Sequence, residues 1–152
     1  MRLAAYQPEI AGNMGALLRL AACFEVAVDV IEPCKFSWSD ARMRRAGMDY
    51  AQNVDVTRHA DWAAFWIAER SPAARIVLLT TKASIRLPDF AFCADDVLLM
   101  GSESAGVPLD VAATCDAAVR IPIGAQVRSL NIAVAAGIAL AEALRQTRGF
   151  PT

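Results

Sequence analysis

The sequence predicts an α/β fold in which a single domain, residues 1–152, forms a mostly parallel sheet flanked by helices. Short apolar runs of strand length alternate with amphipathic segments of helix length, in a βαβαβα order. Two of the short runs, 76–79 and 97–100, are apolar at every position, which is typical of strands buried on both faces of a parallel sheet. The length of 152 residues, without a linker or an internal repeat, indicates one domain.

The expected strands are apolar runs that end at turn residues. The first run ends before Pro8, which cannot donate a hydrogen bond to a neighbouring strand, and the second ends before Glu32-Pro33. The remaining runs are bounded by polar segments. The expected strands cover residues 3–6, 27–31, 53–56, 76–79, 97–100 and 118–121.

The expected helices lie between these strands. Gly47 marks the end of a short basic helix, and Asp61 and Pro72 flank another. The last helix carries an apolar stripe of small residues, which either packs in the core or forms a dimer interface. The expected helices cover residues 14–24, 39–46, 61–69 and 129–145.

The charge balance excludes a polybasic tail, because 15 basic residues face 16 acidic ones and the formal net charge is −1. Arginine outnumbers lysine 13 to 2, which either reflects base composition or favours phosphate binding through the planar guanidinium. The one dense basic cluster is Arg42, Arg44 and Arg45, which as a bare charge run would form a solvated helix face.

The sequence predicts a cytoplasmic protein without a membrane span or a metal site. Its longest apolar run, 132–141, is about half of the roughly 20 residues that a membrane span needs. The four cysteines lie far apart without a CxxC pair, so we expect reduced core cysteines and no metal ligands. The single histidine, His59, is expected to be structural, because nothing near it in the sequence forms a catalytic triad.

The candidate ligand site is the edge of the sheet where the strands end, because parallel α/β sheets bind ligands outside the carboxyl ends of their strands. The loops that follow Tyr6, Leu79, Met100 and Ile121 meet at that edge. Two of these loops are rich in glycine, which allows backbone to approach a ligand closely. Neither contains GxGxxG or GxxxxGK[ST], so the dinucleotide-binding and P-loop fingerprints are missing.

Four residues near these loops have a structural interpretation beside a functional one. Asn13 and Ser129 each stand where a helix N-cap is expected. Arg19 is a solvated helix charge unless it points toward the ligand end of the sheet. Glu103 lies in a glycine-rich turn, where a carboxylate can simply accept local backbone hydrogen bonds.

Three motifs, taken in order, resemble those of the SPOUT superfamily of knotted RNA methyltransferases. The first begins at Asn13 and reads N-x-G followed by R-L. The second begins at Leu99 and reads L-x-G-x-E-x-x-G-V-P, and the third begins at Ile121 and reads I-P-I followed by R-S-L-N. The resemblance covers nearly the whole chain and is narrowed to the small TrmL-type enzymes by Pro8-Glu9-Ile10, Ile31-Glu32-Pro33, residues 44–50 and residues 142–146.

The resemblance implies an α/β sheet whose C-terminal part is tied in a trefoil knot, an exception to the rule that chains avoid knots. It also implies a homodimer with the active site at the interface. S-adenosylmethionine is the implied cofactor, held bent in the knot mainly by backbone groups. The cofactor contacts implied by position are Leu79, Thr80, Gly101, Glu103, Ile121, Ser129 and Leu130.

TrmL-type enzymes methylate the ribose 2′-OH of the tRNA wobble nucleotide, so the implied substrate is cytidine or uridine 34 in the anticodon loop. A cationic Arg19 would stabilise the negative charge that develops on that oxygen, whereas a guanidinium is a poor proton acceptor. Asn13 would position Arg19 or the ribose, and Glu103 would shape its loop or orient Arg19. Ser129 and Asn131 complete the implied catalytic set, and the implied RNA contacts are Arg42, Arg44, Arg45 and Arg128.

The sequence departs from the family pattern at four positions. Ser102 replaces a proline, so we expect a less rigid loop. Ala16 and Val134 replace asparagines, and Ala141 replaces a tyrosine, which leaves the exact tRNA contacts open.

Three alternatives remain at this stage. The same enzyme class could act on ribosomal RNA, although the chain lacks an added RNA-binding domain. A SPOUT protein that binds RNA without catalysis would explain the missing polar groups. A Rossmann-type oxidoreductase would require binding of NAD.

Overall fold

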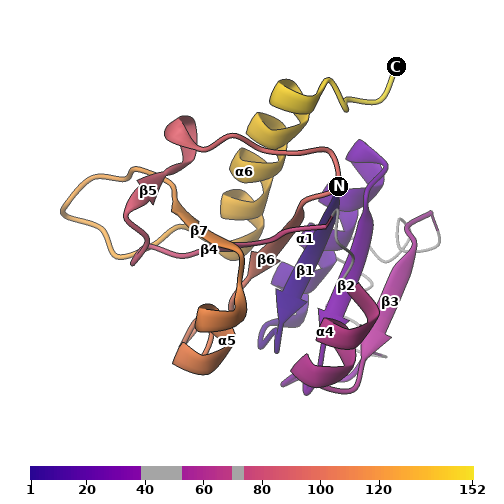
Figure 1. The fold of residues 1–152 in the computed structure, drawn as a ribbon. Helices are drawn as coiled ribbons and strands as arrows, with labels where there is room; N and C mark the ends of the chain where they lie inside the picture. The colour runs from indigo at the N-terminus through magenta and orange to yellow at the C-terminus, as the bar shows by residue number, and fades with distance from the viewer. Residues whose placement is uncertain (39–52, 70–73) are drawn as a thin grey trace.

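The computed structural model describes residues 1–38, 53–69 and 74–152, and these form an α/β fold around a seven-stranded sheet (Figure 1). The order across the sheet is β3-β2-β1-β6-β4-β7-β5, and each neighbouring pair is parallel. The predicted fold class is therefore confirmed. The strands are β1 (Arg2–Tyr6), β2 (Ala27–Ile31), β3 (Val56–His59), β4 (Ile76–Leu79), β5 (Ile85–Arg86), β6 (Val97–Met100) and β7 (Ala117–Arg120).

Helices cover both faces of the sheet. Residues of α1 and α6 share one buried cluster with the sheet, and residues of α4 and α5 share a second cluster on its other face. A short 3₁₀ helix, η2, follows β5. The helices are α1 (Ala11–Phe24), α4 (Trp62–Glu69), η2 (Leu87–Asp89), α5 (Leu109–Thr114) and α6 (Ile132–Thr147).

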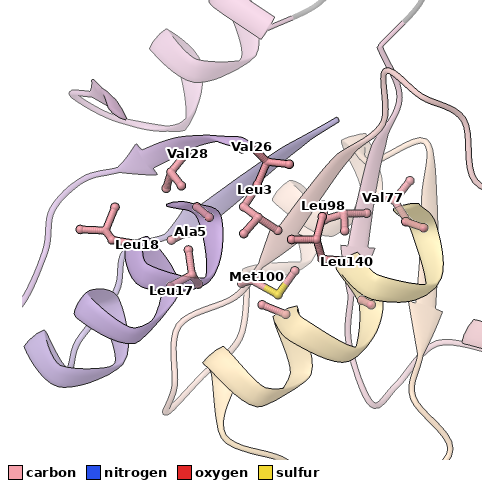
Figure 2. Packing of buried hydrophobic residues seen from close by; sticks show 14 of the residues in the cluster. Leu3, Ala5, Leu17, Leu18, Val26, Val28, Val77, Leu98, Met100 and Leu140 are labelled. Atoms are coloured by element: carbon pink, nitrogen blue, oxygen red, sulfur yellow. The ribbon is translucent and has the colours of Figure 1, made fainter. Parts of the chain in front are cut away.

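The larger cluster lies between the sheet and the α1–α6 layer. Figure 2 shows Leu17 of α1 and Leu140 of α6 directed toward strand residues that include Leu3 and Leu98. These four side chains are at most 1% exposed. Fully burying a leucine side chain contributes about 1.5–3 kcal/mol, so this layer fixes α1 and α6 on the sheet and thereby places the loops that precede them.

Three strands match their predicted bounds at 27–31, 76–79 and 97–100, and β1 and β7 differ by one residue from the predicted 3–6 and 118–121, whereas edge elements differ more. The prediction of a strand at 53–56 was wrong by three residues, because β3 is an edge strand whose Thr57 and Arg58 give it no continuous apolar run. The two-residue strand β5, η2 and the six-residue α5 were not predicted, since such short elements have no measurable period. The predicted helix at 39–46 lies outside the described residues.

Two predicted helix starts were also wrong. Helix α1 begins at Ala11, so Asn13 lies inside its first turn and is not its N-cap. Helix α6 begins at Ile132, and its N-cap is Asn131 rather than Ser129. The Asn131 side chain accepts hydrogen bonds from the backbone N–H groups of Ala133 (2.9 Å) and Val134 (3.4 Å), which satisfies two of the otherwise unpaired donors at the start of the helix.

His59 has a structural environment. Its Nε2 lies 2.8 Å from Oδ1 of the fully buried Asp29, and its ring packs edge-on against Phe65. Asp29 also accepts two hydrogen bonds from the guanidinium of Arg2, at 2.8 and 3.0 Å. This buried carboxylate therefore joins β1, β2 and β3, and neither Asp29 nor His59 lines the cavity at the glycine-rich loops.

The cysteines are free, but the expectation that all four lie in the core was wrong, since only Cys34 and Cys115 pack against the buried clusters. Cys23 and Cys93 are exposed, and Cys34 and Cys115 are half-buried. In the described ranges, no group of three or more His, Cys, Asp or Glu side chains could hold a metal ion. None of the helices in the described part of the chain is long and apolar enough to cross a membrane.

Candidate active site

A cavity of about 780 Å³ opens at the carboxyl ends of β4, β6 and β7. Its floor includes strand residues such as Leu79 and Met100, and its walls are the loops that follow the three strands. The start of α1 adds Ile10 and Asn13. Cavities of this size and mostly apolar lining are typical of sites for small organic ligands and cofactors.

Nine of the predicted site residues line this one cavity. They come from segments that are far apart in the sequence and include every cofactor contact that the resemblance implied. The nine residues are Asn13, Leu79, Thr80, Gly101, Glu103, Ile121, Ser129, Leu130 and Asn131.

The predicted arginines lie elsewhere. Arg19 is exposed on α1 and Arg128 is exposed on the loop between β7 and α6, and neither lines the cavity. Arg42, Arg44 and Arg45 lie outside the described residues. Among the cavity-lining residues that the structure describes, the only basic one is Lys82.

The loop after β6 is closed on itself by a short antiparallel bridge. The backbone N–H of Ser102 and that of Gly106 each donate 2.9 Å to the carbonyl oxygen of the other residue. The Ser102 hydroxyl also donates to the Gly106 carbonyl, at 3.0 Å. A proline at position 102, the family residue, could make neither of the two bonds that Ser102 donates, so serine here supplies closure of a different kind.

Two glycines are required by the shape of this loop. Gly106 has φ = +72°, a conformation that side-chain-bearing residues rarely adopt. A Cβ added at Gly101 would lie 2.6 Å from backbone atoms of Gly106, which is closer than real contacts allow. The loop can therefore close this tightly only with glycine at position 101.

The Glu103 carboxylate is fastened to the start of α1. It accepts hydrogen bonds from the backbone N–H groups of Glu9 (2.9 Å) and Ile10 (3.3 Å) and from the side-chain amide of Asn13 (3.1 Å). Ile10 cannot cap the helix with its own side chain, so a carboxylate from more than 90 residues away supplies the negative charge that a helix N-terminus favours. Glu103 thus acts on its own loop and on α1 together.

An amide chain continues from Glu103 to α6. Asn13 donates to Glu103 and its carbonyl oxygen accepts from the side-chain amide of Asn131, at 2.9 Å. Because Asn131 also caps α6, three predicted residues link the loop after β6, the start of α1 and the start of α6. The sequence predicted their proximity but not that they bond to one another.

Glu9 is a member of this arrangement that sequence reasoning did not select as a site residue. Its carboxylate accepts hydrogen bonds from the backbone N–H and the hydroxyl of Ser104, both at 2.8 Å, and pairs with the Nζ of Lys35. The hydrogen bond from Lys35 and then those from Ser104 hold the pKa of Glu9 below its ordinary value. The signal in the sequence was the Pro8-Glu9-Ile10 segment, which contributed only to the resemblance.

Comparison with known proteins supplies the family. Residues 1–141 match the SpoU rRNA Methylase family. The chain belongs to this family. A tRNA (cytidine(34)-2′-O)-methyltransferase of Beijerinckia indica is 53% identical over 144 residues, which cover 95% of this chain and 90% of that protein.

Solved structures show the same architecture as this SpoU-family chain. One, described as structural insights into the 2-OH methylation of C/U34 on tRNA, has a TM-score of 0.91 and 39% identity and covers 95% of this chain and 94% of its own. An AdoMet-bound rRNA methyltransferase from Sinorhizobium meliloti has a TM-score of 0.86 and 28% identity, and covers 95% of this chain and 55% of its own. The SpoU methylase fold therefore extends over nearly all of the chain.

Proposed function

We propose that this SpoU-family chain transfers a methyl group from S-adenosylmethionine to the ribose 2′-OH of the wobble nucleotide, cytidine or uridine 34, in the tRNA anticodon loop. The observation that carries the proposal is the convergence of three separate loops, with the implied cofactor contacts, on one cavity. The names of the similar proteins support the choice of tRNA and of position 34.

The cavity suits the proposed cofactor. Its volume of about 780 Å³ and its apolar floor accept a nucleoside-sized ligand. Leu79, Ile121 and Leu130 would contact the apolar surface of the bound S-adenosylmethionine. When bound, S-adenosylmethionine supplies an electrophilic methyl group on a sulfonium.

The residues of the chain would act by alignment and charge. Holding the two reactants in line can supply roughly 7–11 kcal/mol of a barrier. The chain Glu103–Asn13–Asn131 would keep the start of α1 in a fixed place relative to the cavity. Arg19 would stabilise the negative charge on the attacking ribose oxygen.

The position of Arg19 favours a site completed by a second chain. Arg19 does not line the cavity of its own chain, yet the proposed chemistry needs a cation at the ribose oxygen. Val134 and Ile138 of α6 are 51% and 41% exposed, which provides an apolar surface for a second copy. We therefore propose a homodimer in which Arg19 of one protomer serves the cavity of the other.

The RNA contacts and the knot are further parts of the proposal. Arg128 lies exposed on the loop after β7, and we propose that it contacts a phosphate of the RNA. Arg42, Arg44 and Arg45 are proposed as additional phosphate contacts, and the enzyme would act in the cytoplasm. We also propose that the chain after β7 passes through a preceding loop, as the trefoil knot that the family resemblance implies.

Label transfer tests the proposal. The protein is incubated with total tRNA and S-adenosylmethionine that carries a tritiated methyl group, and the labelled nucleotide is mapped. We expect 2′-O-methylcytidine or 2′-O-methyluridine at position 34. Label on a base, or on a nucleotide outside the anticodon loop, would reject the proposal.

Ribosomal RNA is the second candidate substrate. The observation that favours it is the description of the matched family and of the AdoMet-bound neighbour, both of which name rRNA. A parallel incubation with ribosomal RNA decides between the two, because preferential labelling of ribosomal RNA would support this candidate. A protein that binds S-adenosylmethionine and labels neither RNA would instead be a binding protein without catalysis.

A further inference from the structure

Glu9 occupies an unusual position beside the cavity. Its side chain is only 12% exposed, although it is a charged residue at the surface, and it does not line the cavity itself. Its carboxylate is shared between Ser104, which lines the cavity, and Lys35, which follows β2. It therefore connects the segment after β2 with the loop after β6.

The connection between the two segments runs in both directions. The Glu9 carboxylate accepts from Ser104, and the backbone N–H of Glu9 donates 2.9 Å to the carboxylate of Glu103. A backbone contact from Lys35 N–H to the Pro8 carbonyl, at 3.1 Å, keeps Lys35 next to Glu9. The start of α1 and the loop after β6 are thus joined by two carboxylates: Glu9 binds Ser104 of the loop, and Glu103 of the loop binds the backbone of Glu9.

We propose that Glu9 is a positioning residue for cofactor binding: by holding Ser104, and with Lys35 holding Glu9 in turn, it keeps residues 101–106 in the shape that accepts S-adenosylmethionine. The inference rests on the proposed function for the identity of that ligand. Ser102 and Gly106 close the loop from within, and Glu9 holds Ser104, which lies between them, from outside.

The contacts of Glu9 have a local effect rather than a global one. Ser104 is exposed and the Lys35 side chain is 69% exposed, so both groups regain water when Glu9 loses its charge. No buried donor is left without a partner, and the fold loses little stability. The effect of a Glu9 substitution is therefore concentrated in the loop that it holds.

Calorimetric titration with S-adenosylmethionine tests this inference on Glu9→Gln, Ser104→Ala and Ser104→Thr. We expect Glu9→Gln to raise the Kd by about tenfold, the size that follows when hydrogen bonds to a charged group are lost. Ser104→Ala should raise the Kd less, because the backbone N–H of residue 104 still donates to Glu9. Ser104→Thr keeps a hydroxyl donor and should bring the Kd back toward the wild-type value. Asp89→Asn is the matched control, since Asp89 is also a surface carboxylate bonded to a basic residue, Arg86, and should bind like the wild type.

Kinetics and thermal unfolding separate positioning from other roles. Positioning predicts a higher KM for S-adenosylmethionine, an unchanged kcat at saturating cofactor, an unchanged KM for tRNA and an unchanged Tm. Wild-type affinity of Glu9→Gln for S-adenosylmethionine would overturn the inference. A loss of affinity that is accompanied by a matching fall in Tm, or a defect that appears only in the KM for tRNA, would overturn it as well. Failure of the wild-type protein to bind S-adenosylmethionine would instead overturn the proposed function, and the inference with it.

Discussion

The two glycine-containing loops at the cavity differ in how they are held. The loop after β6 is closed by the Ser102–Gly106 bridge and fastened to α1 through Glu103. In the loop after β7, residues 124–129 are all exposed, and the turn from Gly124 to Val127 is closed by a 3.2 Å backbone hydrogen bond. One loop is thus fixed by contacts within the chain, whereas the other presents its backbone and side chains to solvent.

This difference indicates a division of work. A loop held by its own hydrogen bonds is organised before a ligand arrives, so less binding free energy is lost in ordering it. An exposed loop is available to order around a cofactor, an RNA strand or a second protomer. We infer that the loop after β6 is the part of the cofactor site that is organised in advance, and that the exposed residues 124–128 of the loop after β7 serve the larger partners.

Removal of Arg19 gives the largest expected effect, because it removes the charge that stabilises the attacking oxygen. It leaves both loops intact, so the effect is expected in catalysis and not in cofactor binding. Arg19→Ala should reduce kcat by about 10²–10³-fold, the range for loss of one group that stabilises a developing oxyanion. Binding of S-adenosylmethionine should be unchanged, since Arg19 does not line the cavity. Single-turnover methylation and calorimetry measure the two quantities, and unchanged methylation would remove Arg19 from the mechanism.

Mixing experiments sharpen the Arg19 prediction. If Arg19 serves the other protomer, mixed dimers of Arg19→Ala chains with chains that cannot bind cofactor regain activity at one of their two sites. Absence of any recovery in dimers that are shown to exchange subunits would contradict the shared site.

Glycine-to-alanine substitutions compare the two loops directly. Gly101→Ala places a Cβ 2.6 Å from the Gly106 backbone and should open the closed loop. We expect strain of about 1–3 kcal/mol and a corresponding loss of roughly 10- to 100-fold in cofactor affinity. The matched substitution Gly124→Ala meets nothing within 4 Å and should bind cofactor as the wild type does. Equal affinities in the two variants would contradict the assignment of cofactor binding to the loop after β6.

Asn131 joins the two regions, and its substitution should have an intermediate effect. Asn131→Ala removes the cap of α6 and the bond to Asn13, and should lower the free energy of unfolding by about 1 kcal/mol. Asn131→Asp keeps the cap acceptor but loses the donor to Asn13. Urea denaturation of both variants separates the contributions: equal stability of Asn131→Ala and wild type would show that the cap is not stabilising.

The smallest expected effect is at Arg128 on the exposed loop. Arg128→Ala should weaken tRNA binding a few-fold and reduce the slope of log affinity against log salt concentration by about 1, as expected for one phosphate contact. Binding of S-adenosylmethionine should not change. An unaltered salt dependence would show that Arg128 does not contact phosphate.

The elements predicted best from the sequence are strands that are buried along their whole length. The central strands 76–79 and 97–100 are apolar throughout, so their bounds could be read directly from the residues. The edge strand β3 was misplaced because three of its four residues are polar. Short elements such as α5 depend on tertiary contacts that local patterns do not contain.

The same distinction applies to the site. Topology alone places loops after parallel strands at one edge, so the meeting of the loops at a cavity could be predicted, whereas Gly101, Ile121 and Ser129 were selected within them by the family resemblance. The choice between Ser129 and Asn131 as helix cap could not, because both residue types cap well and the bond to Asn13 is a tertiary contact. The role of Glu9 depends on partners 26 and 95 residues away.

A structure of the protein with S-adenosylhomocysteine, the product form of the cofactor, tests the central claim most directly. The account predicts the ligand in the cavity at the ends of β4, β6 and β7, against Leu79, Gly101 and Ile121, with Arg19 of a second protomer at the mouth of the cavity, on the side from which the ribose oxygen would approach. A ligand bound elsewhere, or a cavity that stays empty at saturating concentration, would contradict it.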